Sequence, residues 1–96
     1  MNTDQPPDSP VNLPITDELD LHTFDVRDIK SVVEEYLYQC HLKGFSEVRI
    51  IHGKGIGTQR NMVRSVLKNS PYVRSFSEAP PESGGWGATL VRIEPG

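Results

Sequence analysis

The junction of a strand, a glycine-rich loop and a helix in the middle of the chain constrains the fold most. Residues 46–51 end in a near-continuous apolar run, which is typical of a strand covered on both faces or central in its sheet. The loop that follows opens directly onto a helix-like segment, residues 58–69, and has glycine at every second position: Ile51-His52-Gly53-Lys54-Gly55-Ile56-Gly57-Thr58. Bare backbone at a helix N-terminus presents unpaired N–H donors and the positive end of the helix dipole, so this junction suits an anion such as a phosphate.

A strand and a helix are predicted before this junction. Residues 18–22 alternate between polar and apolar side chains, which indicates a first strand. Asp25 is suited to cap a helix that ends at Gly44. That helix has one apolar stripe, formed by residues that recur at helical spacing: Val26, Ile29, Val33, Tyr36, Leu37 and Cys40.

A helix and two strands are predicted after the junction. Thr58 is expected to cap the second helix, which Ser70-Pro71 ends, and the core face of this helix holds Met62, Val63, Val66 and Leu67. Residues 72–77 and 88–93 indicate two further strands. The order β-α-β-α-β-β predicts an α/β fold of the two-layer (α+β) sandwich type. Its sheet is small, mixed and four-stranded, with both helices on one face and the last strand antiparallel.

Composition divides the 96 residues into a tail and one domain. Four of the eight prolines lie within the first 14 residues, and residues 1–17 contain too few apolar groups to offset the entropy of ordering them. We therefore expect a flexible N-terminal tail over 1–17 and a folded domain over 18–96. After residue 18, nine acids accompany all ten bases, and a body this close to neutrality can still present a basic face to a polyanion.

Several classes of protein do not fit the sequence. It has no apolar run of about 18 residues to span a membrane and no secretory signal at its N-terminus. The single cysteine, Cys40, excludes an internal disulfide and fits a reducing, cytoplasmic setting. The glycine loop lacks the last glycine of the dinucleotide-binding pattern and has the wrong lysine order for the phosphate loop of NTPases, which argues against those enzymes.

The candidate site lies at the predicted carboxyl ends of the parallel strands, where open α/β sheets bind their ligands. Asp20 and His22 end the first strand and, being two residues apart, share one face, while His52 ends the second strand. Candidates for holding phosphate or nucleic acid come from two glycine-rich loops and from a basic stripe on the second helix. They are Gly53, Lys54, Gly55 and Gly57, then Gly85, Trp86 and Gly87, and finally Arg60 and Arg64 with Lys68.

Each candidate also has a structural interpretation. Asp20 is suited to capping a turn, and a histidine beside a strand end is often a satisfied structural residue. The basic residues can form an ordinary solvated helix face, and the glycines can serve turns only. Trp86 suits either a lid over the core or a platform on which a base stacks. The candidates form a site only where they converge at one edge of the sheet, as predicted.

Three short motifs, in their order and spacing, resemble the signatures of the Smr (small MutS-related) domain family. They are Leu19-Asp20-Leu21-His22, His52-Gly53-Lys54-Gly55 and Gly84-Gly85-Trp86-Gly87-Ala88-Thr89-Leu90-Val91. The resemblance spans about residues 19–94 and departs from the family pattern at Thr23, where glycine is common. It implies a two-layer domain similar to the C-terminal domain of bacterial translation initiation factor three. The first two motifs form the family's presumed active region.

What the resemblance implies about function is nucleic-acid binding and, in several members, nicking of DNA or cleavage of RNA. Some bacterial members act on mRNA at stalled ribosomes, so the ribosome is a further expected partner. The first hypothesis is an endonuclease with Asp20, His22 and His52 as catalytic residues and the glycine loop with Lys54 as the phosphate holder. The same three catalytic candidates are one option for holding a divalent metal such as Mg²⁺.

Two alternatives remain open at this point. In the first, the domain binds a nucleic-acid or ribosomal-RNA backbone without cutting it. In the second, the 80–87 loop serves as a protein-interaction surface.

Overall fold

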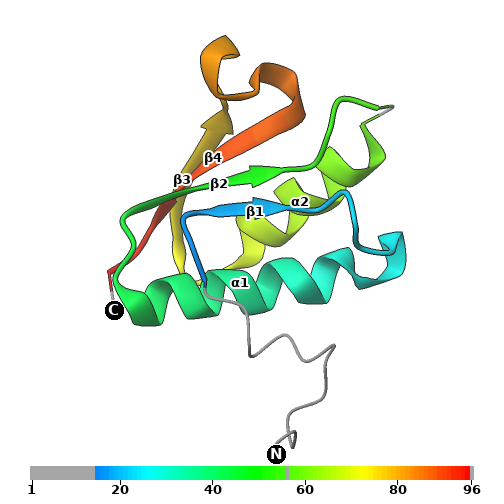
Figure 1. Ribbon diagram of the computed structural model, residues 1–96. Coiled ribbons are helices and arrows are strands. Elements are labelled where there is room, and N and C mark those ends of the chain that lie inside the picture. Colours follow the sequence, from blue (N-terminus) through cyan, green and yellow to red (C-terminus); the bar gives the residue numbers. More distant parts are fainter. Residues whose placement is uncertain (1–14, 56, 96) are drawn as a thin grey trace, which may run out of the picture.

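The computed structural model describes residues 15–55 and 57–95, and the predicted order of elements is confirmed (Figure 1). The strands are β1 (Glu18–Asp20), β2 (Glu47–Ile51), β3 (Val73–Glu78) and β4 (Ala88–Ile93). The helices are α1 (Ile29–Lys43) and α2 (Thr58–Asn69), and three 3₁₀ turns are η2 (Val26–Asp28), η3 (Pro81–Ser83) and η4 (Gly85–Gly87). The part of the predicted tail that comprises residues 1–14 lies outside the described residues.

The four strands form one mixed sheet in the order β1-β2-β4-β3. β1 runs parallel to β2, with Asp20 opposite Ile51, and β4 runs antiparallel to both β2 and β3. Figure 1 shows both helices on the same side of this sheet. The predicted two-layer architecture and the antiparallel last strand are therefore confirmed.

The core lies between the sheet and the two helices. Val48 and Ile50 point into it from β2, because side chains alternate between the two faces of a strand. The buried residues of the helices are Ile29, Val33, Tyr36, Leu37 and Cys40 from α1, and Val63, Val66 and Leu67 from α2. No helix in the described part of the chain is long and apolar enough to cross a membrane.

The C-terminal end of α1 is as predicted, but its N-terminal end and its apolar stripe differ from the prediction. α1 begins at Ile29, with Asp28 at the N-cap and no side-chain cap. The Asp25 carboxylate accepts a hydrogen bond from the Arg27 backbone N–H at 3.0 Å and caps the turn η2, which leads into α1. Gly44 ends the helix in a left-handed conformation, with φ of 79°. Val26, however, lies in η2 and is 49% exposed, so it is not part of the core stripe.

The start of α2 differs from the prediction. Its N-cap is Gly57, with φ of 89°, and no side chain caps the helix. Thr58 is the first residue inside the helix and is exposed. A left-handed φ at the cap favours glycine, because a side chain would be strained there. Gly57 therefore occupies the N-cap position that was predicted for Thr58.

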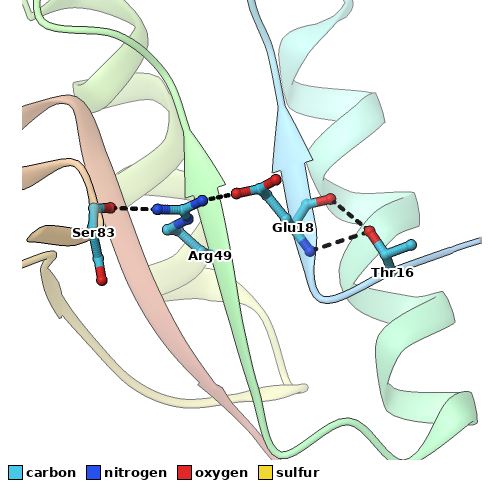
Figure 2. Close-up of polar contacts among 4 residues, drawn as sticks. All are labelled: Thr16, Glu18, Arg49 and Ser83. Atoms are coloured by element: carbon cyan, nitrogen blue, oxygen red, sulfur yellow. Dashed lines mark hydrogen bonds and ion pairs between the residues drawn. The ribbon is translucent and has the colours of Figure 1, made fainter.

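A chain of polar contacts crosses the open face of the sheet (Figure 2). Arg49 of β2 forms an ion pair with Glu18 of β1 and donates a hydrogen bond of 2.8 Å to the Ser83 carbonyl in η3. Thr16 in turn exchanges hydrogen bonds with the backbone of Glu18, and the Tyr36 hydroxyl donates to the Thr16 carbonyl. Arg49 thus connects β2 both to β1 and to η3, the turn before the Gly84–Gly87 loop.

Candidate active site

The loop after β1, the glycine loop after β2 and the 84–87 loop meet at the carboxyl ends of β1 and β2. The two strands leave the sheet together, since the Leu21 N–H still donates to the Ile51 carbonyl at 2.9 Å. The backbone N–H groups of His52 and Gly53 both donate to the Gly87 carbonyl, at 3.0 and 2.9 Å. The prediction that the 84–87 loop reaches this edge is therefore confirmed.

Gly87 is the point of closest approach between the two glycine loops. A Cβ atom there would lie 3.3 Å from Cγ of Lys54 and 3.5 Å from the carbonyl carbon of Gly53. Beside it, the Trp86 indole N–H donates to the Lys54 carbonyl at 3.1 Å. The glycine thus allows one backbone to pack against the other, and the tryptophan fixes the Lys54 loop in place.

Asp20 and His22 form an exposed pair at the end of β1. One carboxylate oxygen, Oδ1 of Asp20, lies 3.0 Å from the His22 backbone nitrogen and 2.7 Å from Nδ1 of its ring. β1 ends at Asp20 rather than at His22 as predicted, because the Leu21 carbonyl accepts from the Phe24 N–H and the Gly53 N–H donates to Gly87 instead of pairing with β1. The His22 backbone N–H, and after it the His22 ring, hold the pKa of Asp20 below its usual range.

This pair has the geometry of an oriented base. A carboxylate only accepts hydrogen bonds, so the proton of a neutral His22 ring lies on Nδ1, facing Asp20. The lone pair then lies on Nε2. The side chain of His22 is 76% exposed, which leaves Nε2 accessible to a substrate.

His52 is in the opposite situation, because it is buried and fully bonded. Its Nδ1 lies 3.1 Å from the Gly53 carbonyl, which only accepts, so Nδ1 carries the proton. Its Nε2 lies 3.0 Å from the hydroxyl of Thr89, which donates to it. Burial lowers the pKa of His52, and the charges of Arg60 and Arg64 lower it further. The surroundings therefore favour the neutral form of His52, and both ring nitrogens are engaged within the protein.

The three residues considered as metal ligands are not assembled into one set. Within residues 15–55 and 57–95, no group of three or more His, Cys, Asp and Glu side chains lies close enough to hold a metal ion. Asp20 and His22 pair with each other, whereas the imidazole of His52 points to Thr89. In this structure Asp20, His22 and His52 do not come together as one ligand set, because two hydrogen-bond networks separate them.

The arginines of α2 are packed against other side chains rather than spread along a solvated face. The Arg60 guanidinium lies 3.8 Å from the centre of the Trp86 ring and 3.9 Å from a carboxylate oxygen of Glu78. The Arg64 guanidinium lies 5.5 Å from the centre of the Phe76 ring, and burial lowers its pKa. Of the predicted stripe, Lys68 is exposed.

These two arginines also retain unused hydrogen-bonding capacity. Among the described residues, the Nε atoms of Arg60 and Arg64 are buried without a hydrogen-bond partner. Two guanidinium groups beside one carboxylate leave a net positive charge at this end of α2.

A hollow of about 430 Å³ opens between the glycine loop and the start of α2. It is lined by Val26, His52, Gly53, Gly55, Gly57, Thr58, Gln59 and Arg60. The N–H groups of the first helical turn have no intrahelical acceptors, so they are free to bind an anion there. The N–H groups of His52 and Gly53 are not free to bind an anion, because both already donate to the Gly87 carbonyl.

Sequence reasoning missed the partners that organise this edge. Thr89 is fully buried in β4, opposite Ile50 and on the same face, which places its hydroxyl beside His52. Phe76 and Glu78 of β3 support the two arginines. Thr89 had a detectable signal, because it is a polar residue within the apolar strand 88–93. The other two depend on strand pairing and had none.

Comparison with known proteins identifies the family. The chain matches the model of the Smr domain over residues 19–94. It is 40% identical over 77 residues to the endonuclease MutS2 of Carboxydothermus hydrogenoformans and 37% identical over 78 residues to that of Thermus thermophilus. These alignments cover 80% and 81% of the chain but only 10% of each relative, so the chain spans about a tenth of their length.

Two solved structures share the fold and the sequence pattern. The Smr domain of Thermus thermophilus MutS2 superimposes with a TM-score of 0.77 at 37% identity, over 81% of this chain and 98% of that domain. YdaL, a stand-alone small MutS-related protein from Escherichia coli, gives 0.71 at 31% identity, over 84% of this chain and 66% of YdaL. With its motifs placed together at one sheet edge, this chain belongs to the Smr domain family.

Proposed function

We propose that this domain is a nucleic-acid endonuclease that uses His22 as its general base. The observation that carries the proposal is the 2.7 Å contact between Asp20 and the ring of His22, at the exposed end of β1, whose neighbour β2 leads into the glycine loop. The endonuclease names of the MutS2 relatives support the reaction class. The hollow and the arginines at the start of α2 support a polyanionic substrate.

The chemistry follows from the protonation of the pair. With Nδ1–H held by Asp20, Nε2 of His22 takes the proton of the attacking oxygen, which is a water molecule or the adjacent 2′-hydroxyl of RNA. Proton transfer to such a positioned group typically contributes about 10²–10⁴-fold to the rate. Asp20 stabilises the imidazolium that forms. The attacking oxygen bonds to phosphorus, and the P–O bond to the leaving oxygen breaks, so that this oxygen takes the electron pair and then a proton from water.

The phosphate is held by the neighbouring elements. Lys54 and the first turn of α2 supply positive charge and N–H donors, which stabilise charge that develops on the phosphate oxygens. His52 acts here as a positioning residue, because its ring joins Thr89 of β4 to the Gly53 loop.

The test is cleavage of labelled single- and double-stranded DNA and RNA, with and without EDTA. The wild type is compared with the double variant Asp20→Asn/His22→Ala. The matched control is His41→Ala, which removes an imidazole that contacts the Glu94 carbonyl. We expect cleavage by the wild type and by the control, and loss of cleavage with retained binding in the double variant. Cyclic phosphate ends that persist in EDTA identify attack by the 2′-hydroxyl.

A non-catalytic binding module is the alternative, and the partly buried arginine cluster favours it, because that cluster suits binding without cutting. It predicts salt-sensitive binding by all three proteins. Residual cleavage that is equal in the wild type and the double variant identifies a contaminating nuclease and refutes the catalytic proposal.

A further inference from the structure

Trp86 is held rigidly at the edge of the hollow yet remains 43% exposed. Its indole N–H is fixed on the Lys54 carbonyl, and the Arg60 guanidinium covers one face of its ring at 3.8 Å. The exposed surface therefore belongs to the opposite face and the outer edge of the ring. The Arg60 side chain beneath it is only 17% exposed, so this stack is packed into the protein rather than loose on the surface.

This arrangement differs from that of Tyr38, which is exposed to a similar extent. Tyr38 is 40% exposed, but it packs against Tyr72 at the opposite end of α2, with the ring centres 5.7 Å apart. Trp86 instead lies beside the hollow, because Arg60 both stacks on it and lines that cavity. Arg60 therefore links the two features, and a strand with a phosphate in the hollow lies near the ring of Trp86.

We infer that Trp86 is a stacking platform for an unpaired base, so that the site takes single-stranded or unstacked nucleotides. The inference rests on the proposed function, and it adds the class of substrate. In a duplex, both faces of each base are already stacked on neighbours, so the ring gains a partner only where the strand is unpaired or a base turns out of the helix. The cation behind Trp86 helps to hold the ring in its orientation.

The chain offers a direct readout, since Trp86 is its only tryptophan. Intrinsic tryptophan fluorescence is titrated with oligo(dT), with oligo(U), with a blunt DNA duplex of equal length and with inorganic polyphosphate. We expect strong quenching at saturation with the two single strands and little change with the duplex or with polyphosphate, although all four polyanions bind at low salt.

Variants then separate stacking from a structural role. Trp86→Leu removes the aromatic face, Trp86→Phe keeps it without the N–H, and Tyr38→Leu is the control for loss of an equally exposed aromatic ring. Affinities are measured with labelled oligonucleotides. Trp86→Leu should lose about 5- to 150-fold in affinity for single strands. Its affinity for the duplex should stay unchanged, and Trp86→Phe should retain most of the preference.

The outcomes distinguish this inference from the proposed function. Binding of nucleic acid without quenching, or an equal loss of single-strand and duplex affinity in Trp86→Leu, overturns the platform and leaves the endonuclease proposal standing. Absence of binding to every nucleic acid overturns both. Cleavage of single strands by the wild type that persists unchanged in Trp86→Leu, without any loss of affinity, also rejects the platform.

Discussion

His22 and His52 follow neighbouring parallel strands, yet the fold gives them opposite environments. His22 is exposed. One of its ring nitrogens is hydrogen-bonded to Asp20, and the other remains accessible. His52 is 6% exposed, and both of its ring nitrogens are bonded to protein groups. The same residue type is therefore accessible to solvent at one strand end and bonded within the protein at the next.

The difference arises from what lies beside each strand. β1 is an edge strand, so the residues after it face solvent, whereas β2 is flanked by both β1 and β4. β4 brings the Thr89 hydroxyl to His52 and the Gly87 carbonyl to the backbone of the loop. A histidine in a glycine-rich phosphate loop is thus no evidence by itself for a catalytic role.

The largest expected effect comes from His22→Ala. Cleavage should fall by about 10²–10⁴-fold because the base is lost. The thermal midpoint should change little, since this side chain is exposed. Single-turnover rates and thermal unfolding measure the two quantities. A large drop in the midpoint would remove the contrast between the two histidines.

His52→Ala should show the reverse pattern. It leaves the buried Thr89 hydroxyl without its partner and frees the Gly53 carbonyl. We expect the free energy of unfolding to fall by about 1–3 kcal/mol and the midpoint by roughly 5–20 °C. Thr89→Val removes the same contact from the other side, so the double variant should lose less than the sum of the two single losses. Additive losses would contradict a coupled pair.

Arg64→Ala tests the charge at the start of α2 and should have a smaller effect. If Arg64 contacts one phosphate, the slope of log affinity against log salt concentration should become shallower by about 0.7–0.9. Arg74→Ala is the control, since Arg74 is exposed and pairs with Glu94 at 3.6 Å. Binding isotherms at several salt concentrations give the slopes, and equal slopes for both variants remove Arg64 from the interface.

The pH dependence of stability should show the smallest effect. The pKa of His52 is lowered in the folded state, so the unfolded chain binds more protons below about pH 6.5. Stability should hold above that pH and fall as the pH drops toward the folded pKa. Denaturant unfolding of the wild type and of His52→Gln at several pH values measures this decrease in stability. The decrease should be absent in the variant. The lowered pKa of Asp20 adds a separate loss below its usual range, in both proteins.

Much of the fold was predictable because its signals are local. Apolar spacing located both helices, Gly44 and Ser70-Pro71 marked their ends, and residues 88–93 were delimited as β4 has them. The first strand was predicted two residues too long, because the Leu21 carbonyl and the Gly53 N–H, which would form the next bond between the strands, bond to Phe24 and Gly87. The cap of α2 was placed one residue late, since a glycine with a left-handed φ begins the helix without a side chain.

The sequence by itself determined the order of elements, the two glycine loops and the grouping of the motif residues at one sheet edge. Each of these follows from periodicity or from the rule that parallel strands end together. Only the tertiary structure decided which histidine is exposed, which loop amides are already bonded and what packs against Arg60. Those facts depend on β3, η4 and β4, which follow both histidines and Arg60 in the chain, and no local pattern encodes the register in which these strands pair.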